Sequence, residues 1–457
     1  MISKKVWFYG LALAAALVPV RAAEALPPAW PKEPLTLDAA LTIALAHSPA
    51  ILKSQQDLEE SHGISLQQRA VYLPKLNAVG AFNAQDDGKI ESVAFAPGQP
   101  AVKFQTDKNW NAGLQLSQPV YSGGKLKSAA RSSRLTGEAA LAQHQTVVAD
   151  ALLEVRTAYL DVLLAAEQIG TQEASVKLLE QELTDTRRRF EAGTVPRFNV
   201  LRAEVELANA RPRLIKARNA LKNTRNQLAT YLGYRVSADL GEDIPLTTAD
   251  RLTAGAPTVE LGAALARGQQ QRTELEALRK AVQLRQEDIV QARAEYYPHL
   301  SVGAGYGVQS QTFGTPTPSL SDQNHGWNAG AQLNWSIWDF GLTKGRVQAA
   351  EARKAKADLE REDIARRIDL QVRTAYSGWS EAKDILAAQQ RVIEQGEEAL
   401  RLAVARSEAG TGTQLDVLGA QTALTEARNT FSLALRDHAV AWSRLERAMG
   451  DGVVLKR

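Results

Sequence analysis

Residues 327–338, with the sequence WNAGAQLNWSIW, alternate between apolar and polar or very small side chains over twelve positions. A period of two predicts a β-strand with one apolar and one polar face. The length suits a tilted bilayer crossing, and Trp327, Trp335 and Trp338 towards the ends are typical of an interfacial aromatic girdle. Because a single strand would leave backbone groups unpaired in lipid, the pattern requires a closed barrel.

The same stretch has an earlier counterpart, because the tetrapeptide WNAG at 110–113 recurs 217 positions later at 327–330. The offset of 217 also relates VRTAY at 155–159 to 372–376 and EAGT at 191–194 to 408–411. Upstream of the strands, YLPKL at 72–76 corresponds to YYPHL at 296–300, an offset of 224, so the first copy carries seven more residues between these landmarks. The sequence therefore predicts two tandem copies of one unit.

Each copy supplies two alternating segments, at about 76–121 in the first copy and about 299–338 in the second, which predicts four strands in two hairpins. Four strands are too few for a barrel with a bore, since about eight are needed even to enclose side chains. We therefore predict a symmetric oligomer, and three copies would give twelve strands. The predicted lipid-facing residues include Trp110, Leu114, Trp327, Leu333 and Trp335.

The long segment 125–192 contains no proline, and its apolar residues recur at intervals of seven. A strict seven-residue period predicts a left-handed coiled coil, and at ~1.5 Å per residue the helix would be on the order of 100 Å long. The second copy repeats the period, and return helices are predicted at about 200–232 and 415–449. The heptad positions are Leu141, Val148, Val155, Val162, Ile169, Val176, Leu183 and Phe190, followed in the second copy by Val372, Trp379, Leu386, Ile393 and Leu400.

These patterns predict a mainly α-helical protein with a membrane β-barrel. Residues 1–22 have the charged start and short apolar core of a signal peptide, and the proline-rich segment 23–35 is an extended lead-in. The first repeat is expected at 36–233, with a helix break near Pro49, and the second at 258–450. Between them, 234–257 is expected to form an irregular equatorial linker, and 451–457 a C-terminal tail. Pro212 should bend the first return helix or lie in an early turn.

Composition removes several alternatives. The chain has no cysteine, which excludes disulfides and thiolate metal sites. Its formal charge of +3 is matched by Lys4, Lys5 and Arg21 within the signal segment, so nothing indicates nucleic-acid binding. The six histidines are scattered, and the sequence GAGYG at 303–307 lacks the Lys-Ser/Thr ending of a phosphate loop. We predict no catalytic, metal or cofactor-binding residues and no enzyme activity.

Over roughly 35–450, the chain resembles the TolC-like outer-membrane efflux family, also called outer membrane factors. The resemblance rests on the duplication, the YLPKL and YYPHL segments, the VYSGG and IWDFG strand exits, and the turn EAGT followed by Asp416-Val417-Leu418. It implies a homotrimer with a twelve-stranded barrel in outer-membrane lipid and a helical barrel in the periplasm. Such a protein would be the passive exit duct of a tripartite efflux or type I secretion system, working with a periplasmic membrane-fusion adaptor protein and an inner-membrane pump. Drug, metal, peptide and protein cargo are all compatible with this duct.

In that family the helical turns form a periplasmic tip that closes through ion pairs and acidic rings. Asp416 matches the tip acid, although the simpler interpretation is a capping box with Thr413. Asn199, Gly412 and Gly419 depart from the family pattern and put the usual ion-pair lock in doubt. The predicted tip residues are Gly193, Thr194, Asn199, Gly410, Thr411 and Asp416.

Two other functions compete with the duct. One is a periplasmic coiled-coil adaptor or scaffold without a pore, which the alternating strands disfavour. The other is a secreted enzyme on a helical scaffold, which the lack of a clustered nucleophile, base or metal set disfavours.

Overall fold

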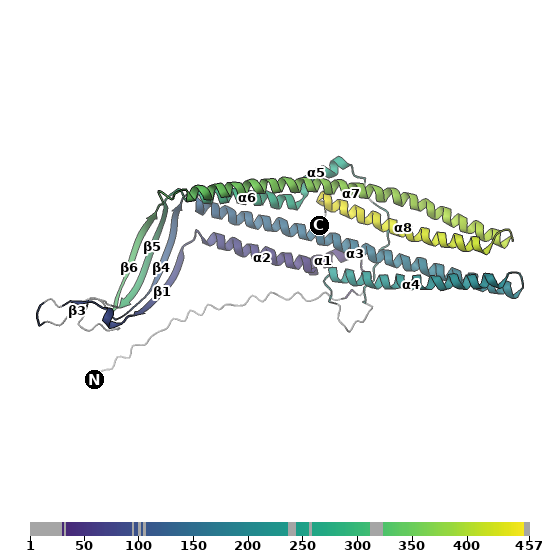
Figure 1. The fold of residues 1–457 in the computed structure, drawn as a ribbon, viewed down its shortest axis with the longest axis horizontal. Helices are drawn as coiled ribbons and strands as arrows, with labels where there is room; N and C mark the ends of the chain where they lie inside the picture. Colours follow the sequence, from purple (N-terminus) through teal and green to yellow (C-terminus); the bar gives the residue numbers. More distant parts are fainter. Residues whose placement is uncertain are drawn as a thin grey trace, which may run out of the picture.

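The computed structural model describes residues 30–31, 33–93, 96–98, 102–103, 107–235, 244–255, 258–310 and 323–451. The molecule is elongated, with a β-sheet at one end and helices along the rest of its length (Figure 1). The predicted signal peptide and all but the first residue of the predicted C-terminal tail lie outside the described residues. Among the described helices, none is both long and apolar enough to cross a membrane.

The sheet contains one hairpin from each copy. Its four strands are antiparallel in the order β1-β4-β5-β6, so pairing between β4 and β5 joins the two copies. A small two-stranded sheet, β2 and β3, lies in the segment between β1 and β4. The strands are β1 (Lys75–Ala84), β2 (Ser92–Val93), β3 (Val102–Lys103), β4 (Lys108–Ser122), β5 (His299–Ser310) and β6 (Gln323–Asn334).

The last strand is displaced from its predicted position at 327–338. β6 begins four residues earlier, at Gln323, and ends at Asn334, which pairs with His299 at the start of β5. The alternation continues in the sequence beyond Asn334, but Pro298 precedes β5 and the neighbouring strand offers no further partner. Backbone pairing, rather than the hydrophobic period, therefore sets the C-terminal end of this strand.

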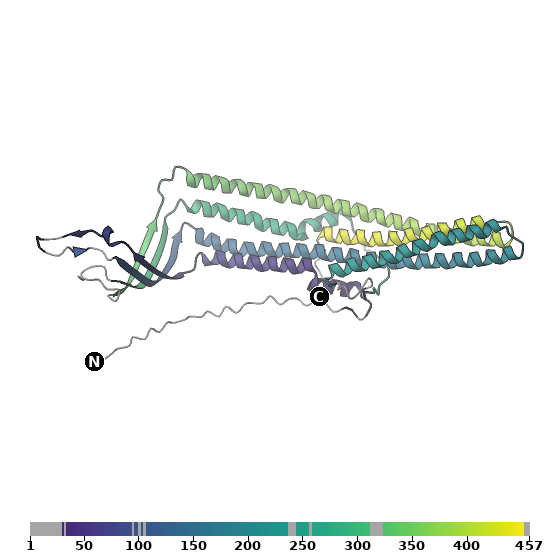
Figure 2. The ribbon, with the colours of Figure 1, turned by 60° about the horizontal axis from the view of Figure 1, so that its bottom comes forward.

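Eight helices are described, two of them 67 residues long. The long helices run the full length of the helical body, and shorter helices fill the space beside them (Figures 1 and 2). The helices are α1 (Leu37–His47), α2 (Pro49–Ala70), α3 (Lys125–Glu191), α4 (Arg197–Tyr231), α5 (Leu261–Gln271), α6 (Thr273–Ala294), α7 (Leu342–Glu408) and α8 (Gln414–Met449).

The helical body is four helices wide along its length. Near the sheet, α2 packs on α3, α3 on α6, and α6 on α7. In the other half, α4 replaces α2 and α8 replaces α6, which gives the order α4-α3-α8-α7. The helices α1 and α5 pack against the middle of this layer, where the linker segment 244–255 also bonds to Leu35.

The predicted duplication is confirmed by the core. Val155 of α3 and its counterpart Val372 of α7 are both buried, as are Leu228 of α4 and Leu445 of α8. The heptad is only partly buried within one copy, because Leu141 and Phe190 remain exposed. Pro212 lies inside α4 and not in an early turn, so the second of the two predicted placements is wrong.

Candidate channel wall and periplasmic tip

The strand register carries one apolar face across the whole sheet. Leu114 of β4 lies opposite Tyr306 of β5, which lies opposite Trp327 of β6. Side chains on one face alternate with those on the other, so these rows extend the face along each strand. The register also places Gly80, Gln118 and His325 on this face. Its apolar residues are Leu76, Ala78 and Phe82 on β1; Trp110, Ala112, Leu114 and Leu116 on β4; Leu300, Val302, Ala304, Tyr306 and Val308 on β5; and Trp327, Ala329, Ala331 and Leu333 on β6.

The opposite face contains mainly polar and very small residues. Gln115 pairs with Gly305, and Gly305 pairs with Asn328. The small size is needed at Gly113, where an added Cβ would lie only 2.9 Å from the backbone oxygen of Tyr306. A sheet with one apolar face and one polar, crowded face matches the two sides of a barrel wall.

Most of the large apolar side chains on this sheet are exposed in a single copy, whereas Trp110, Leu300 and Val308 are half-buried. Trp327 is 79% exposed and Leu333 is 65% exposed. Trp335 is also exposed, but it lies one residue beyond β6, and its indole Nε1 donates to the Tyr296 carbonyl oxygen at 3.1 Å. An apolar patch that crosses four strands is too extensive for a surface in contact with water.

At the far end of the molecule, both long helices end in the same turn. Gly193 and Gly410 adopt left-handed φ values of 73° and 72°. The Thr194 amide donates to the carbonyl of Arg189, and the Gly193 amide to that of Phe190, which is the Schellman arrangement. The Thr194 hydroxyl donates a second bond to the Arg189 carbonyl at 2.8 Å.

The second turn has the same bonds. The Thr411 amide and hydroxyl both donate to the carbonyl of Arg406, at 3.0 and 3.3 Å. The Gly410 amide donates to Ser407, as in the first turn. The sequence predicted that Gly193 and Gly410 belong to these turns, but it did not predict that both threonine side chains bond carbonyls of the last helical turn.

The helices that follow these turns begin differently. In α8 the Asp416 amide donates to the Thr413 hydroxyl, and the Thr413 amide donates to the Asp416 carboxylate at 3.0 Å, which confirms the predicted capping box. In α4 the corresponding positions are Pro196 and Asn199, and no side chain caps the helix. The backbone and side-chain bonds from Thr413 lower the pKa of Asp416 within one copy.

Two helices that are distant in the sequence meet near the tip. The Gln414 side-chain amide donates to the Thr186 hydroxyl at 2.5 Å and to the Glu182 carboxylate at 3.1 Å. This contact links the start of α8 to α3. The contact could not be predicted from the sequence, because Gln414, Thr186 and Glu182 do not belong to a repeated motif.

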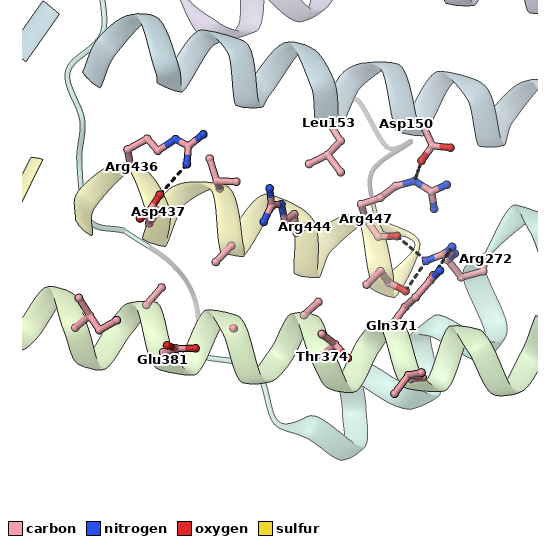
Figure 3. Close-up of a pocket in the computed structure, with 18 of the residues that line it drawn as sticks. Asp150, Leu153, Arg272, Gln371, Thr374, Glu381, Arg436, Asp437, Arg444 and Arg447 are labelled. Atoms are coloured by element: carbon pink, nitrogen blue, oxygen red, sulfur yellow. Dashed lines mark hydrogen bonds and ion pairs between the residues drawn. The ribbon is translucent and has the colours of Figure 1, made fainter. Parts of the chain in front are cut away.

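A groove of ≈1070 Å³ lies over α8, between α3 and α7, in the middle of the helical body (Figure 3). At one end, Arg447 donates to Asp150 and Glu274, both at 2.7 Å, and Arg272 donates to Glu274 at 2.8 Å. Burial alone would raise the pKa of Glu274, but the bonds from Arg272 and Arg447 outweigh it and lower that pKa to about 2. The network joins the two repeats, because Asp150 belongs to α3.

Comparison with known proteins identifies the family to which this sheet and helical body belong. The family model described as "Outer membrane efflux protein" matches residues 40–234 and 265–451, which is most of the chain. The chain belongs to the outer membrane efflux protein family. Its fold therefore combines an α-helical barrel with a β-barrel, and it is an outer-membrane channel whose helical part lies in the periplasm. The family consists of channel proteins, not enzymes, and the finding favours the duct over the adaptor.

Individual relatives are similar at low identity over most of their length. The alkaline protease secretion protein AprF of Pseudomonas aeruginosa is 24% identical over 416 residues, covering 88% of this chain and 82% of AprF. The cobalt-zinc-cadmium resistance protein CzcC of Cupriavidus metallidurans is 25% identical, covering 93% of this chain and 92% of CzcC. The solved CmeC outer membrane channel of Campylobacter jejuni superimposes with a TM-score of 0.75 at 15% identity, covering 92% of this chain and 87% of CmeC.

Proposed function

We propose that three copies close into one channel through which substrates leave the periplasm. The observation that carries this proposal is the apolar face shared by all four strands of the sheet, which needs lipid on one side and a closed barrel around the polar side. Trp110, Leu114, Trp327, Leu333 and Trp335 would belong to its lipid-facing surface.

The direction of the strands supports closure by repetition. Within the described residues, β1 and β6 each pair along only one edge. Because neighbours alternate in direction, β1 and β6 of one copy run in opposite directions. The β6 edge of one copy can therefore pair with the β1 edge of the next in the antiparallel manner of the rest of the sheet.

The helical body fits the same assembly, because each copy contributes a layer four helices wide as well as a sheet four strands wide. Three copies would give twelve strands and twelve helices, so each copy would contribute one third of the barrel and one third of the tunnel. Such a head-to-tail contact generates a ring when the rotation closes.

The channel would be passive and would receive its substrates from an inner-membrane pump through a periplasmic adaptor protein. The similarity to channels supports this role, and the relatives AprF and CzcC are named for protein secretion and for metal resistance. We infer that the pump selects the cargo and that the duct itself accepts more than one class. The predicted organisation into signal peptide 1–22, lead-in 23–35, repeats 36–233 and 258–450, linker 234–257 and tail 451–457 belongs to the same proposal.

At the periplasmic tip, we propose that Gly193, Thr194, Asn199, Gly410, Thr411 and Asp416 form the turns that surround the channel opening. Three Asp416 carboxylates would form one acidic ring on the axis, in addition to capping α8. In such a ring, mutual repulsion would counteract the lowering of the pKa that Thr413 causes within one copy.

Planar-bilayer recording tests the duct. The purified mature protein should insert into a bilayer and give discrete, uniform conductance steps. Membrane fractionation separates the adaptor alternative, because an adaptor without a pore would not remain with outer-membrane material. A protein that fractionates with the outer membrane but never conducts would contradict the proposal.

A further inference from the structure

Within one copy, the two repeats meet near the sheet where α3 packs on α6, and we call this contact the seam within a copy. Part of the seam is ionic. Where α3 packs on α6, Lys125 Nζ lies 3.0 Å from the Glu295 carboxylate. One to two turns further along, Arg131 makes a two-point contact with Glu287, at 2.7 and 2.9 Å, and Glu287 is largely buried. At these two positions the cation lies on α3 and the anion lies on α6 or directly after it, whereas further along the pair between Lys280 and Glu138 has the opposite polarity.

Because the chain is duplicated, an equivalent helix-to-helix contact is expected between neighbouring copies, at the two outer edges of the helical layer. Figure 2 shows α2 and α7 at opposite edges of the helical layer near the sheet. In a closed ring, α7 of one copy would lie beside α2 of the next, as α3 lies beside α6 within a copy. The residue at each contact then follows from the offsets of 217 for α3 to α7 and 224 for α2 to α6.

At the position of the first ion pair, both counterparts are apolar. Lys125 corresponds to Leu342 on α7, and Glu295 corresponds to Val71 at the end of α2. In one copy Leu342 is 56% exposed and Val71 is 44% exposed. Two exposed apolar side chains at matching levels on opposite edges are complementary to each other in a ring.

At the neighbouring position a glycine in a close contact is replaced by a large apolar residue, so the contact between copies must be more widely spaced there than the contact within a copy. Gly123 has a φ of +57°, and an added Cβ there would lie 2.5 Å from the Ala294 carbonyl oxygen and 2.8 Å from Tyr297 Cβ. Its counterpart Phe340 has nearly the same φ, +52°, which strains a residue with a side chain, and it is 91% exposed. The counterpart of Tyr297 is Leu73, also exposed.

The second ion pair is also absent between copies, because Arg131 corresponds to Gln348 on α7 and Glu287 to a glycine on α2. Glu287 corresponds to Gly63 on α2, and Ser128, whose hydroxyl donates to the Glu287 carbonyl at 3.1 Å, corresponds to Gly345 on α7. Within the described part of one copy, an added Cβ at Gly63 or Gly345 would meet no neighbouring atom within 4 Å. Glycines at both positions allow the two helices of adjacent copies to approach closely below the apolar contact.

We propose that Phe340 and Leu342 of one copy pack against Leu73 and Val71 of the next copy, so that the seam between copies is apolar where the seam within a copy is ionic. This inference rests on the proposed ring. Lipid is the other apolar environment that could surround Phe340, but lipid would not explain why apolar residues appear on both edges at paired positions.

Because the chain has no cysteine, introduced pairs report on this seam without background. Oxidation of the double variant Leu342→Cys/Val71→Cys should give covalent dimers and trimers on a non-reducing gel. The matched control Lys125→Cys/Glu295→Cys should form a bond only within one chain. Leu342→Cys/Ile64→Cys should not crosslink, since Ile64 lies seven residues, or ~10 Å, along α2.

A charge exchange provides a second test that does not depend on disulfide geometry. Leu342→Lys alone should reduce the trimer fraction about tenfold at equal protein concentration, because it places an unpaired charge in the seam. Leu342→Lys/Val71→Glu should restore trimers, since it recreates the ion pair found between Lys125 and Glu295.

The outcomes separate this inference from the ring itself. Native mass spectrometry that shows trimers, together with no crosslink in Leu342→Cys/Val71→Cys and no rescue by Val71→Glu, would overturn the seam and leave the ring intact. A spin label on the L342C variant that is accessible to oxygen dissolved in lipid would assign this surface to the membrane instead. A monomeric unsubstituted protein would overturn the proposed function.

Discussion

At the middle of the molecule, the two repeats have equivalent helix junctions that are held by different interactions. In the first repeat, the buried Tyr159 hydroxyl donates to the Leu35 carbonyl at 2.8 Å and contacts the Asp250 carboxylate at 2.7 Å. Trp30 stacks on Tyr234 nearby, with ring centroids 4.5 Å apart. This junction is therefore apolar, with a few hydrogen bonds.

The second repeat uses a buried ionic network at the corresponding place. Arg272 and Arg447 are each only 8% exposed, and both donate to Glu274. Their counterparts in the first repeat are Ser48 and Thr230. The difference follows from the neighbours, because α8 of the second repeat lies beside α3 of the same chain, where Asp150 offers a carboxylate. The two repeats therefore share the same helices, but the residues at each junction differ with the helix that packs against it.

In the sheet, by contrast, the two repeats are alike, and this likeness gives the largest predicted effect. Leu333 and its counterpart Leu116 both lie on the apolar face, so Arg at either should destabilise the barrel, by about 2–4 kcal/mol per copy at mid-membrane depth and by less towards the strand end where Leu333 lies. Outer-membrane assembly should fail in both variants, measured as folded trimer after detergent extraction. Arg at Gln332 or its counterpart Gln115 should assemble and change conductance instead. Equal damage on both faces would show that the faces are assigned wrongly.

At the equatorial junctions the repeats should respond unequally. Glu274→Gln leaves Arg272 and Arg447 largely buried with only Asp150 as an ionic partner, and should destabilise the protein by about 3 kcal/mol. Tyr159→Phe removes one hydroxyl, while Asp250 keeps its bond from the Leu37 amide, so the loss should be about 1 kcal/mol. Chemical unfolding in detergent, followed by helical circular dichroism, compares the two. Similar losses would contradict the ionic character of the second junction.

The contributions of the two junctions to folding stability should also depend differently on pH. The folded pKa of Glu274, about 2, lies below its ordinary value of 4.5, so its contribution is present above about pH 4.5 and is lost as the pH falls towards 2. The pKa of Tyr159 is raised, through burial and its bond to Asp250, so its contribution is lost only in strong alkali. Unfolding midpoints measured between pH 6 and pH 2 should fall more steeply for the unsubstituted protein than for Glu274→Gln. Parallel curves would exclude Glu274 as the titrating group.

The smallest effect concerns the tip, where the repeats differ by one carboxylate. If Asp416 lines the opening, Asp416→Asn should reduce cation selectivity and weaken block by multivalent cations in planar bilayers. Asn199→Asp at the matching position of the first repeat should have the opposite effect. If Asp416 only caps α8, Asn replaces it almost equally well and the reversal potential should not change. Unchanged selectivity in both variants would leave Asp416 as a cap alone.

Much of this fold could be predicted because its signals are periodic. Alternation identified the four strands, the seven-residue period identified α3 and α7, and the glycines at 193 and 410 marked where the helices turn. The end of β6 was predicted incorrectly because Asn334 is the last residue with a partner, which depends on another strand. The bonds from Arg447 to Asp150 and Glu274 could not be predicted, since they join residues 297 and 173 positions apart without a shared motif.

Native mass spectrometry of the mature, detergent-solubilised protein tests the central claim most directly. The claim is that four strands and a body four helices wide are one third of a closed wall. It predicts a single species with three times the mass of the mature chain, stable at dilution and matched by one conductance level in bilayers. A monomer or dimer that still forms a complete conducting pore would contradict it.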